Sequence, residues 1–339
     1  MATCGRGINR ASVADPLVGE RLLRKTTEKD HGERPQSVAT TIVDMHYRLL
    51  RPATITNDQS HRSMTYDQQN IATCKDIATY RDKAIEISRI AGVKILELFT
   101  PDIEVTCKPD ETPLTAADLA ANEIIINQLK TIDADLPVIT EESCEISLEE
   151  RSEWDTYWLV DPLDGTREFI NQQGEFSVNI ALIHKGKPVL GVVHAPVLET
   201  TYWATKGGGA WKQIGDESPR KISVRKAPDK RVTVALSWAT QLSKELQRFL
   251  DNLGDHSELR MGGALKSCLV AEGRADIYAC LGPTGEWDTA AAQCILEEAG
   301  GRITDTRMKS LRYNTRKTLL NPDFFAFGSS NRCWSDYLV

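Results

Sequence analysis

One stretch of the chain, residues 157–170, constrains the fold and the chemistry more than any other. It opens with a short apolar run that is typical of a buried strand. Asp161 and Asp164 follow, and then come Gly165 and Thr166, where the backbone can turn sharply into a helix. Carboxylate oxygens suit Mg²⁺, and the free N–H groups of a first helical turn bind phosphate oxygens. The stretch predicts a joint site for a metal ion and a phosphate, with a proline-containing turn before a capped helix as the alternative.

Three further acidic residues stand where secondary structure is expected to begin or end. Asp118 completes a capping-box pattern at the start of a helix. Glu141 follows a short strand at residues 136–140, and Asp288 lies in the first turn of a helix at residues 287–299. Each acid has an ordinary explanation, as a helix cap, a solvated surface group or an acid favoured by the helix dipole. Taken singly, these positions do not distinguish a structural role from a shared site.

The pattern of apolar residues divides the chain into three parts. Residues 1–70 mix charges of both signs with few periodic apolar positions, and we expect a disordered N-terminal extension. Residues 71–226 begin with an amphipathic helix that ends near Phe99 and a second helix from Thr115 to about Lys130, and they continue as an antiparallel meander. They are expected to form an α+β half that holds the metal and the phosphate. Residues 227–335 alternate strands and helices, which predicts an α/β half.

A glycine triplet, Gly207–Gly209, lies inside the meander. A glycine-rich loop can cradle phosphate, but this one joins two expected strands and no helix follows it. A hairpin turn is therefore the favoured interpretation.

Composition limits the classes of function. The 339 residues contain no apolar run of about 18, so no membrane-spanning helix is expected. Eight cysteines are scattered without a CxxC pair, which favours reduced thiols over a disulfide framework or a zinc site. The net charge of −7 argues against a nucleic-acid polymer as partner. A small-molecule phosphate substrate and an intracellular location fit these limits, and the oligomeric state is left open.

Three separated motifs resemble those of a known enzyme family. They are Thr140–Ser143, Asp161–Thr166 and Trp287–Ala291. In this order they are similar to the motifs of the lithium-sensitive, Mg²⁺-dependent inositol monophosphatase superfamily, over about residues 71–330. The resemblance implies an α/β fold, a layered α/β/α/β/α sandwich built from the α+β half and the α/β half. It also implies that the α/β half, residues 227–335, binds the rest of the substrate. It also implies a phosphoric monoester hydrolase that uses two or more Mg²⁺ ions.

The resemblance assigns the metal ligands position by position. Glu141, Asp161 and the carbonyl of Leu163 would hold one Mg²⁺. Asp161, Asp164 and Asp288 would hold a second, so that Asp161 bridges the two ions. A crowded group of carboxylates is tolerable if cations belong there, which agrees with this assignment.

The resemblance also assigns catalytic and substrate-binding residues. Thr166, oriented by Asp118, would position and deprotonate the attacking water, while the amides of Gly165 and Thr166 hold the phosphate. Lys266 matches a lysine that contacts substrate. The implied substrate site consists of Glu141, Leu163, Asp164, Gly165, Thr166, Lys266 and Asp288.

Within the superfamily, the bisphosphate nucleotidase branch is the most similar. Arg167–Ile170, Gly174–Ile183 and Leu265–Gly273 resemble that branch. The implied reaction converts adenosine 3′,5′-bisphosphate to AMP and phosphate, as in sulfur assimilation. The location implied is the cytoplasm, with peripheral association at the cytoplasmic face of the inner membrane as a further possibility.

Three places depart from the branch pattern. They are Trp238–Thr240, Gly263–Ala264 and Cys280, where relatives place groups that face the nucleotide. A phosphatase for inositol phosphates or another small sugar phosphate is therefore the alternative. A regulator that binds metal or nucleotide without catalysis is a third hypothesis, and the retention of Asp118 and Thr166 argues against it.

Overall fold

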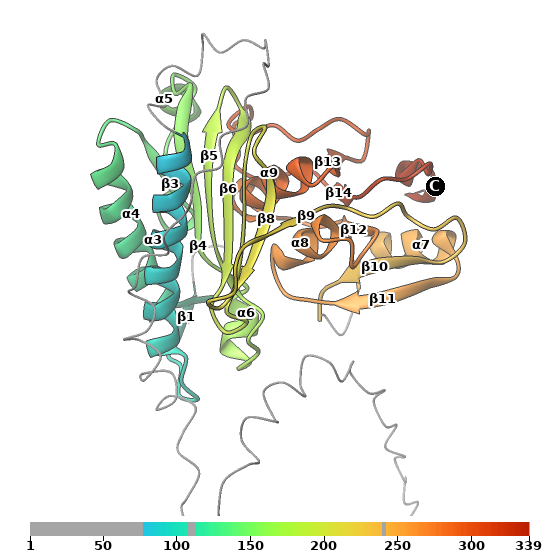
Figure 1. Ribbon diagram of the computed structural model, residues 1–339, viewed down its shortest axis with the longest axis horizontal. Helices are drawn as coiled ribbons and strands as arrows, with labels where there is room; N and C mark the ends of the chain where they lie inside the picture. The colour runs from blue at the N-terminus through green and yellow to red at the C-terminus, as the bar shows by residue number, and fades with distance from the viewer. Residues whose placement is uncertain (1–76, 108–112, 239–241, 339) are drawn as a thin grey trace, which may run out of the picture. The chain divides into compact units, whose positions relative to one another are not determined.

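The chain is described by a computed structural model that covers residues 77–107, 113–238 and 242–338 (Figure 1). The expected N-terminal extension, residues 1–70, lies outside these described residues. Within them, five layers follow one another in the order α/β/α/β/α, which confirms the layered sandwich (Figure 1). None of the described helices combines the length and the apolar character needed to cross a bilayer.

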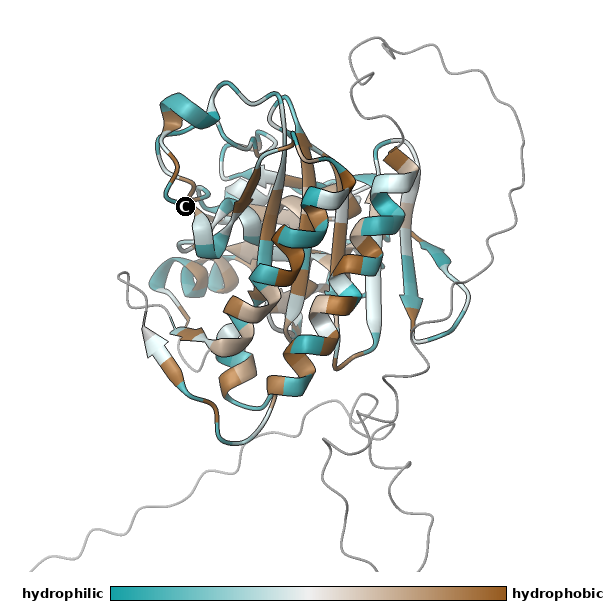
Figure 2. Cartoon of the chain, turned by 90° about the vertical axis from the view of Figure 1, so that its left-hand side faces the viewer, coloured by the Kyte–Doolittle hydropathy of each residue, from teal (hydrophilic) through white to brown (hydrophobic). Residues whose placement is uncertain are grey.

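The outer helical layer consists of α3 (Ile77–Leu98) and α4 (Ala116–Ile132). Figure 2 views this layer face on, with hydrophilic and hydrophobic residues alternating along the two neighbouring helices. The apolar side of α3, from Tyr80 to Ile95, is buried against the sheet behind it, as the helical spacing predicts. Thr115 caps α4 in a capping box with Asp118, so the expected helix start is confirmed.

A seven-stranded sheet forms the second layer. Its strands, in spatial order, are β3 (Val138–Thr140), β4 (Thr156–Asp164), β5 (Ser177–His184), β6 (Lys187–Ala195), β7 (Thr200–Thr205), β8 (Gly209–Ile214) and β9 (Arg220–Ile222). The strands from β4 to β9 form the expected antiparallel meander, while β3 pairs with β4 in parallel. The parallel pair matters for the site, because it brings the carboxyl ends of β3 and β4 to the same edge.

The glycine triplet is the hairpin turn between β7 and β8, as expected. The amides of Gly207 and Gly209 do face an anion, but it is the carboxylate of Glu298, whose two oxygens accept them at 2.9 Å each. The turn therefore fastens the sheet to the helix that carries Glu298.

That helix, α9 (Ala290–Glu298), packs with α8 (Leu265–Ala271) between the two large sheets. Gly191 of β6 permits the close approach of α9, since a Cβ at Gly191 would lie 2.3 Å from the carbonyl oxygen of Ala291. The start of this helix differs from the expectation. A 3₁₀ turn, η3 (Glu286–Asp288), comes first, so Asp288 precedes the α-helix.

The fourth layer is a five-stranded sheet, and α7 (Lys244–Leu253) with η4 (Trp334–Leu338) covers its outer face. Its strands are β10 (Val232–Leu236), β11 (His256–Arg260), β12 (Ile277–Cys280), β13 (Arg302–Asp305) and β14 (Phe324–Phe327), in the spatial order β11-β10-β12-β14-β13. The first three are parallel, as strand–helix alternation predicts, but β14 and β13 add antiparallel pairs that the alternation did not indicate.

Short elements complete the described residues: β1 (Val105–Cys107), β2 (Pro113–Thr115), η2 (Glu141–Ser143), α5 (Leu148–Arg151) and α6 (Thr166–Ile170). Residues 138–222 supply the larger sheet and residues 232–327 the smaller one. The division of the chain at residues 226 and 227 into two functional halves stays a prediction.

Candidate active site

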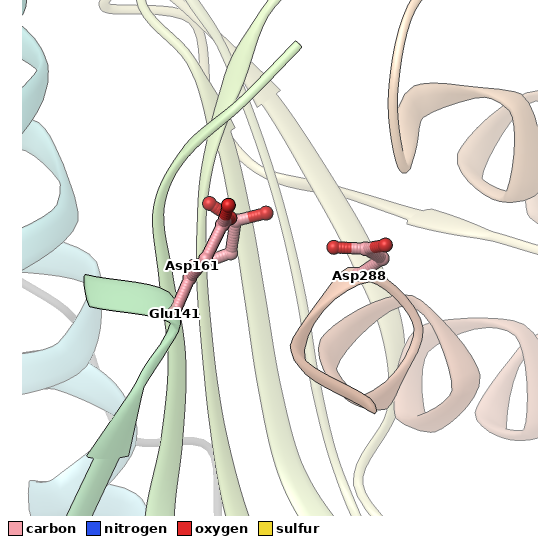
Figure 3. Close-up of side chains that lie close together, drawn as sticks. All are labelled: Glu141, Asp161 and Asp288. Carbon is pink, nitrogen blue, oxygen red and sulfur yellow. The ribbon is translucent and has the colours of Figure 1, made fainter. Parts of the chain in front are cut away.

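Three carboxylates from distant parts of the chain converge between the two sheets. Ligand oxygens of Glu141, Asp161 and Asp288 all lie within 4.8 Å of one another. In Figure 3 the side chains of Glu141 and Asp161 lie together, and that of Asp288 faces them from the other side. These are three of the four acids expected to bind metal.

Strand pairing explains how Glu141 meets Asp161. In the parallel pair, Thr140 lies opposite Val160, so the acids that follow them, Glu141 and Asp161, leave the pair at the same level. β4 does not end at Val160, as the apolar run suggested. It continues to Asp164 with a register shift against β5 between Asp161 and Asp164, which places the two aspartates in different surroundings.

The electrostatics of the cluster favour a cation. Asp161 is buried, and its burial together with the charges of Glu141, Asp164, Asp288 and Asp118 raises its pKa well above the ordinary range. Burial, followed by the charges of Asp164 and Glu141, likewise raises the pKa of Asp288. A divalent cation with oxygen ligands relieves this repulsion, so the three residues fit Mg²⁺ by charge and by donor type.

Asp164 stands apart from the three-carboxylate cluster. Its Oδ2 accepts the Ala264 amide at 2.5 Å and the Asn179 side-chain amide at 3.1 Å. Burial raises the pKa of Asp164, while the charge of Lys266 opposes that rise. Gly263, with φ of +45°, allows the contact, because a Cβ there would lie 2.5 Å from the same Oδ2. Binding of a second ion by Asp164 stays a prediction.

Asp118 caps a helix and also contacts Thr166, and its catalytic role stays a prediction. Its Oδ2 accepts the backbone N–H of Thr115 at 2.7 Å and the Thr115 hydroxyl at 2.6 Å, as a helix cap does. Its Oδ1 faces the hydroxyl of Thr166, which donates to it at 3.4 Å. The cap therefore fixes the carboxylate and leaves one oxygen directed toward Thr166.

Local hydrogen bonds hold the turn between β4 and α6. The Thr166 hydroxyl also lies 3.2 Å from the carbonyl of Leu163, and the Leu163 amide donates to Asp161 Oδ1 at 3.0 Å. Gly165 adopts φ of +95°, the left-handed conformation that favours glycine, and begins the short helix. Phosphate binding by the Gly165 and Thr166 amides stays a prediction.

Lys266 lies in α8 and is buried. Its Nζ stands 4.9 Å from the centre of the Tyr278 ring, a cation–π arrangement. Cys280 lies on the same strand as Tyr278, and its burial raises the pKa of its thiol. Lys266 therefore lies on the side of the site that the smaller sheet contributes, although its contact with substrate is untested.

Sequence reasoning missed two side chains near the site, Asn179 and Glu175. Asn179 is a buried polar residue between the apolar Val178 and Ile180 of β5, and that break in the pattern was a usable signal. Glu175 accepts the amide of Gly262 at 3.0 Å and the indole N–H of Trp238. Because both partners are remote in sequence, nothing local distinguished Glu175 from a surface glutamate.

Known proteins that are similar to this chain indicate its family. The model of the inositol monophosphatase family matches residues 76–329. The chain is 45% identical over 245 residues to the 3′(2′),5′-bisphosphate nucleotidase CysQ of Escherichia coli (strain K12), spanning 72% of this chain and 97% of that protein. The protein of the same name from Haemophilus influenzae is 38% identical over 253 residues, 75% of this chain and 94% of its own length.

Among solved structures, CysQ from Bacteroides thetaiotaomicron, a bacterial member of the inositol monophosphatase family, is similar. It aligns with a TM-score of 0.64 and 36% identity, covering 74% of this chain and 97% of its own. All three residues of the acidic cluster lie inside the span that the family model matches. The chain belongs to the inositol monophosphatase family.

Proposed function

We propose that this protein is a Mg²⁺-dependent phosphatase that converts adenosine 3′,5′-bisphosphate to AMP and inorganic phosphate. The observation that carries the proposal is the convergence of Glu141, Asp161 and Asp288 within 4.8 Å. The substrate comes from relatives that are named 3′(2′),5′-bisphosphate nucleotidases and are matched over almost their whole length. The place in metabolism would be nucleotide recycling during sulfur assimilation.

Two Mg²⁺ ions would be held by the residues that the motifs assign. Glu141, Asp161 and the Leu163 carbonyl would hold one, and Asp161, Asp164 and Asp288 the other. When bound, the ions supply positive charge that lowers the pKa of water and offsets the charge on the leaving oxygen. The raised pKa of buried Asp161 supports the requirement for a cation.

The chain's own groups would move the proton. Thr166 Oγ1 accepts a proton from the attacking water and passes its own hydroxyl proton to Asp118, which stands 3.4 Å away. The water oxygen forms a bond to phosphorus as the bond from phosphorus to the 3′ oxygen breaks. The departing 3′ oxygen takes up a proton from solvent and leaves as the hydroxyl of AMP, and Asp118 returns its proton to solvent.

The alternative substrate is an inositol phosphate or another small sugar phosphate. The departures at Gly263, Ala264 and Cys280 motivate it, because they remove polar groups from the smaller-sheet side of the site. The metal and proton chemistry would be the same, so substrate comparison is the decisive measurement.

The experiment is a phosphate-release assay with Mg²⁺ on four compounds: adenosine 3′,5′-bisphosphate, adenosine 2′,5′-bisphosphate, inositol 1-phosphate and fructose 1,6-bisphosphate. We expect the highest kcat/KM for adenosine 3′,5′-bisphosphate and no release by the Asp161→Asn variant. Higher kcat/KM for inositol 1-phosphate or the sugar bisphosphate than for both nucleotides would refute the nucleotidase assignment. No release from any compound would refute the assignment as an enzyme.

Two further properties are proposed on the resemblance alone. Inhibition by Li⁺ would follow from the metal site, and it is measured in the same assay by titration with LiCl. A cytoplasmic location with peripheral association at the inner membrane is the second, and cell fractionation tests it.

A further inference from the structure

Trp238 stands out among the exposed apolar side chains. The described residues expose four large hydrophobic side chains, and Trp238, 39% exposed, is the aromatic one among them. It follows the last residues of β10 and so lies at the carboxyl end of a parallel strand. In open sheets with parallel strands, ligands bind outside these carboxyl ends.

The indole of Trp238 is held in place. Its N–H donates to Oε2 of Glu175, and the same oxygen accepts the Gly262 amide at 3.0 Å. An indole has a single polar donor, so this bond satisfies the ring and fixes its orientation. An exposed tryptophan with a fixed ring is a preorganised surface, because little side-chain freedom remains to be lost on binding.

Glu175 connects the ring to the active site. A Cβ on Gly262 would lie 2.1 Å from the carbonyl oxygen of Glu175, and one on Gly165 would lie 3.3 Å from it. The Glu175 backbone therefore packs between the turn at Gly165 and the segment at Gly262. The residues just after Gly262 contact Asp164. Burial raises the pKa of Glu175 and of Asp164, and the charge of Lys266 opposes the rise in both, which places both carboxylates near the same cation.

We propose that Trp238 is the base-stacking side chain of this enzyme, held by Glu175 so that the purine of the nucleotide lies against the indole. The proposal rests on the proposed nucleotidase function and names a residue that determines its specificity. Stacking on an aromatic ring recognises the π-face that every base offers. Part of the affinity for the nucleotide would thus come from its base. The residue that stacks on it, Trp238, stands where the resemblance implies polar groups in relatives.

The test compares product inhibition by AMP, which carries a base, with inhibition by inorganic phosphate, which does not. The variants are Trp238→Ala, which removes the ring, and Trp238→Phe, the matched control that keeps one. A contribution of one stacked base, about 1–3 kcal/mol, corresponds to roughly 5- to 150-fold in affinity. We expect W238A to raise the Ki of AMP at least about fivefold, with a Ki for phosphate within twofold of wild type. W238F should stay within about threefold of wild type for both.

Steady-state kinetics separate stacking from a structural role. For adenosine 3′,5′-bisphosphate, W238A should raise KM more than it lowers kcat, because the ring binds the base and not the reacting phosphate. Equal changes in the Ki of AMP and of phosphate, or no change in either, would overturn the proposal. Failure of the proposed function is visible separately, since wild-type protein would then release no phosphate from the nucleotide.

Discussion

Replacing Asp161 by asparagine tests the metal site through two effects of opposite sign. Asp161 is buried, with ligand oxygens of Glu141 and Asp288 within 4.8 Å. Two unit negative charges at 4.8 Å repel by about 3.5 kcal/mol at an effective dielectric constant of about 20. The asparagine oxygen can still accept the Leu163 amide, so the local backbone is retained. Without metal, the variant is expected to be more stable than wild type by up to about 3 kcal/mol, since partial protonation already relieves some repulsion.

Bound Mg²⁺ should make wild type more stable than Asp161→Asn. A ligand at about 100 times its Kd stabilises a protein by about 2.7 kcal/mol, and 1 kcal/mol shifts Tm by about 2–4 °C at this size. Saturating Mg²⁺ should therefore raise the Tm of wild type by about 5–10 °C and that of Asp161→Asn by less than about 2 °C. Phosphate release by the variant should fall at least about 100-fold, because both proposed ions lose a ligand.

The assay is calorimetric unfolding of chelator-treated protein with and without added Mg²⁺.

The pH dependence of the stability of the metal-free protein has a definite sign. Burial and neighbouring carboxylates raise the pKa of Asp161 and Asp288, so the folded state binds more protons than the unfolded state as pH falls toward the raised values. Metal-free wild type should thus gain stability on acidification and approach the variant. Glu123→Gln, an exposed carboxylate on α4, is the control and should show neither effect. A variant that is no more stable without metal and still responds fully to Mg²⁺ would refute the reasoning.

Two further predictions concern Thr166 and His194. Thr166→Val should lower kcat about 100-fold or more with a smaller change in KM, whereas Thr166→Ser should retain most activity; equal losses in the two variants would contradict a role for the hydroxyl. Burial and the charge of Arg89 lower the pKa of His194 to about 3, so it stays neutral in the folded state while the unfolded chain protonates below about pH 6.5. The contribution of neutral His194 to stability is complete above that pH and should decrease by about 2 kcal/mol at pH 5, opposite in sign to the effect of the buried carboxylates. Urea unfolding at both pH values should show a smaller acid loss for His194→Gln, and an unchanged loss would exclude His194 as the cause.

The sequence predicted the parts of the fold that depend on local periodicity. The apolar face of α3, the capping box of α4 and the glycine hairpin all follow from spacing within one element. The smaller sheet was harder to predict from the sequence. Its strand β14 is a four-residue apolar run that neither length nor alternation identifies as an antiparallel strand. Its place between β12 and β13 is decided by tertiary pairing.

The site was predictable to the extent that it consists of side chains. Glu141, Asp161 and Asp288 carry their chemistry in the sequence, and the structure brings them together. The contacts of backbone groups cannot be read from residue types. One partner of Asp164 is the backbone amide of Ala264, a hundred positions away, and no pattern of residue types identifies a backbone amide as a partner. The same applies to Glu175, whose importance depends on contacts with the amide of Gly262 and the indole of Trp238.

Gly263 departs from the family pattern, and two explanations of this departure can be tested against each other. The resemblance to the nucleotidase branch implies serines at the positions of Gly263 and Ala264, and so suggests lost contacts with substrate. In the structure, a Cβ on Gly263 would lie 2.5 Å from Asp164 Oδ2, at a φ of +45° that disfavours other residues. Glycine here thus allows the Ala264 amide to reach Asp164.

Restoring the serines one at a time distinguishes these explanations. If Gly263 serves Asp164, then Gly263→Ser must displace that carboxylate from the Ala264 amide and disturb a proposed metal ligand. We expect kcat/KM for adenosine 3′,5′-bisphosphate to fall about tenfold or more, since losing one hydrogen bond to a charged group costs about 1.5–3 kcal/mol. Ala264→Ser, the matched control next to it, should change kcat/KM less than about threefold. An increase in kcat/KM for Gly263→Ser would instead mean that the serine contacts substrate, and that Asp164 can reach its partners without glycine at this position.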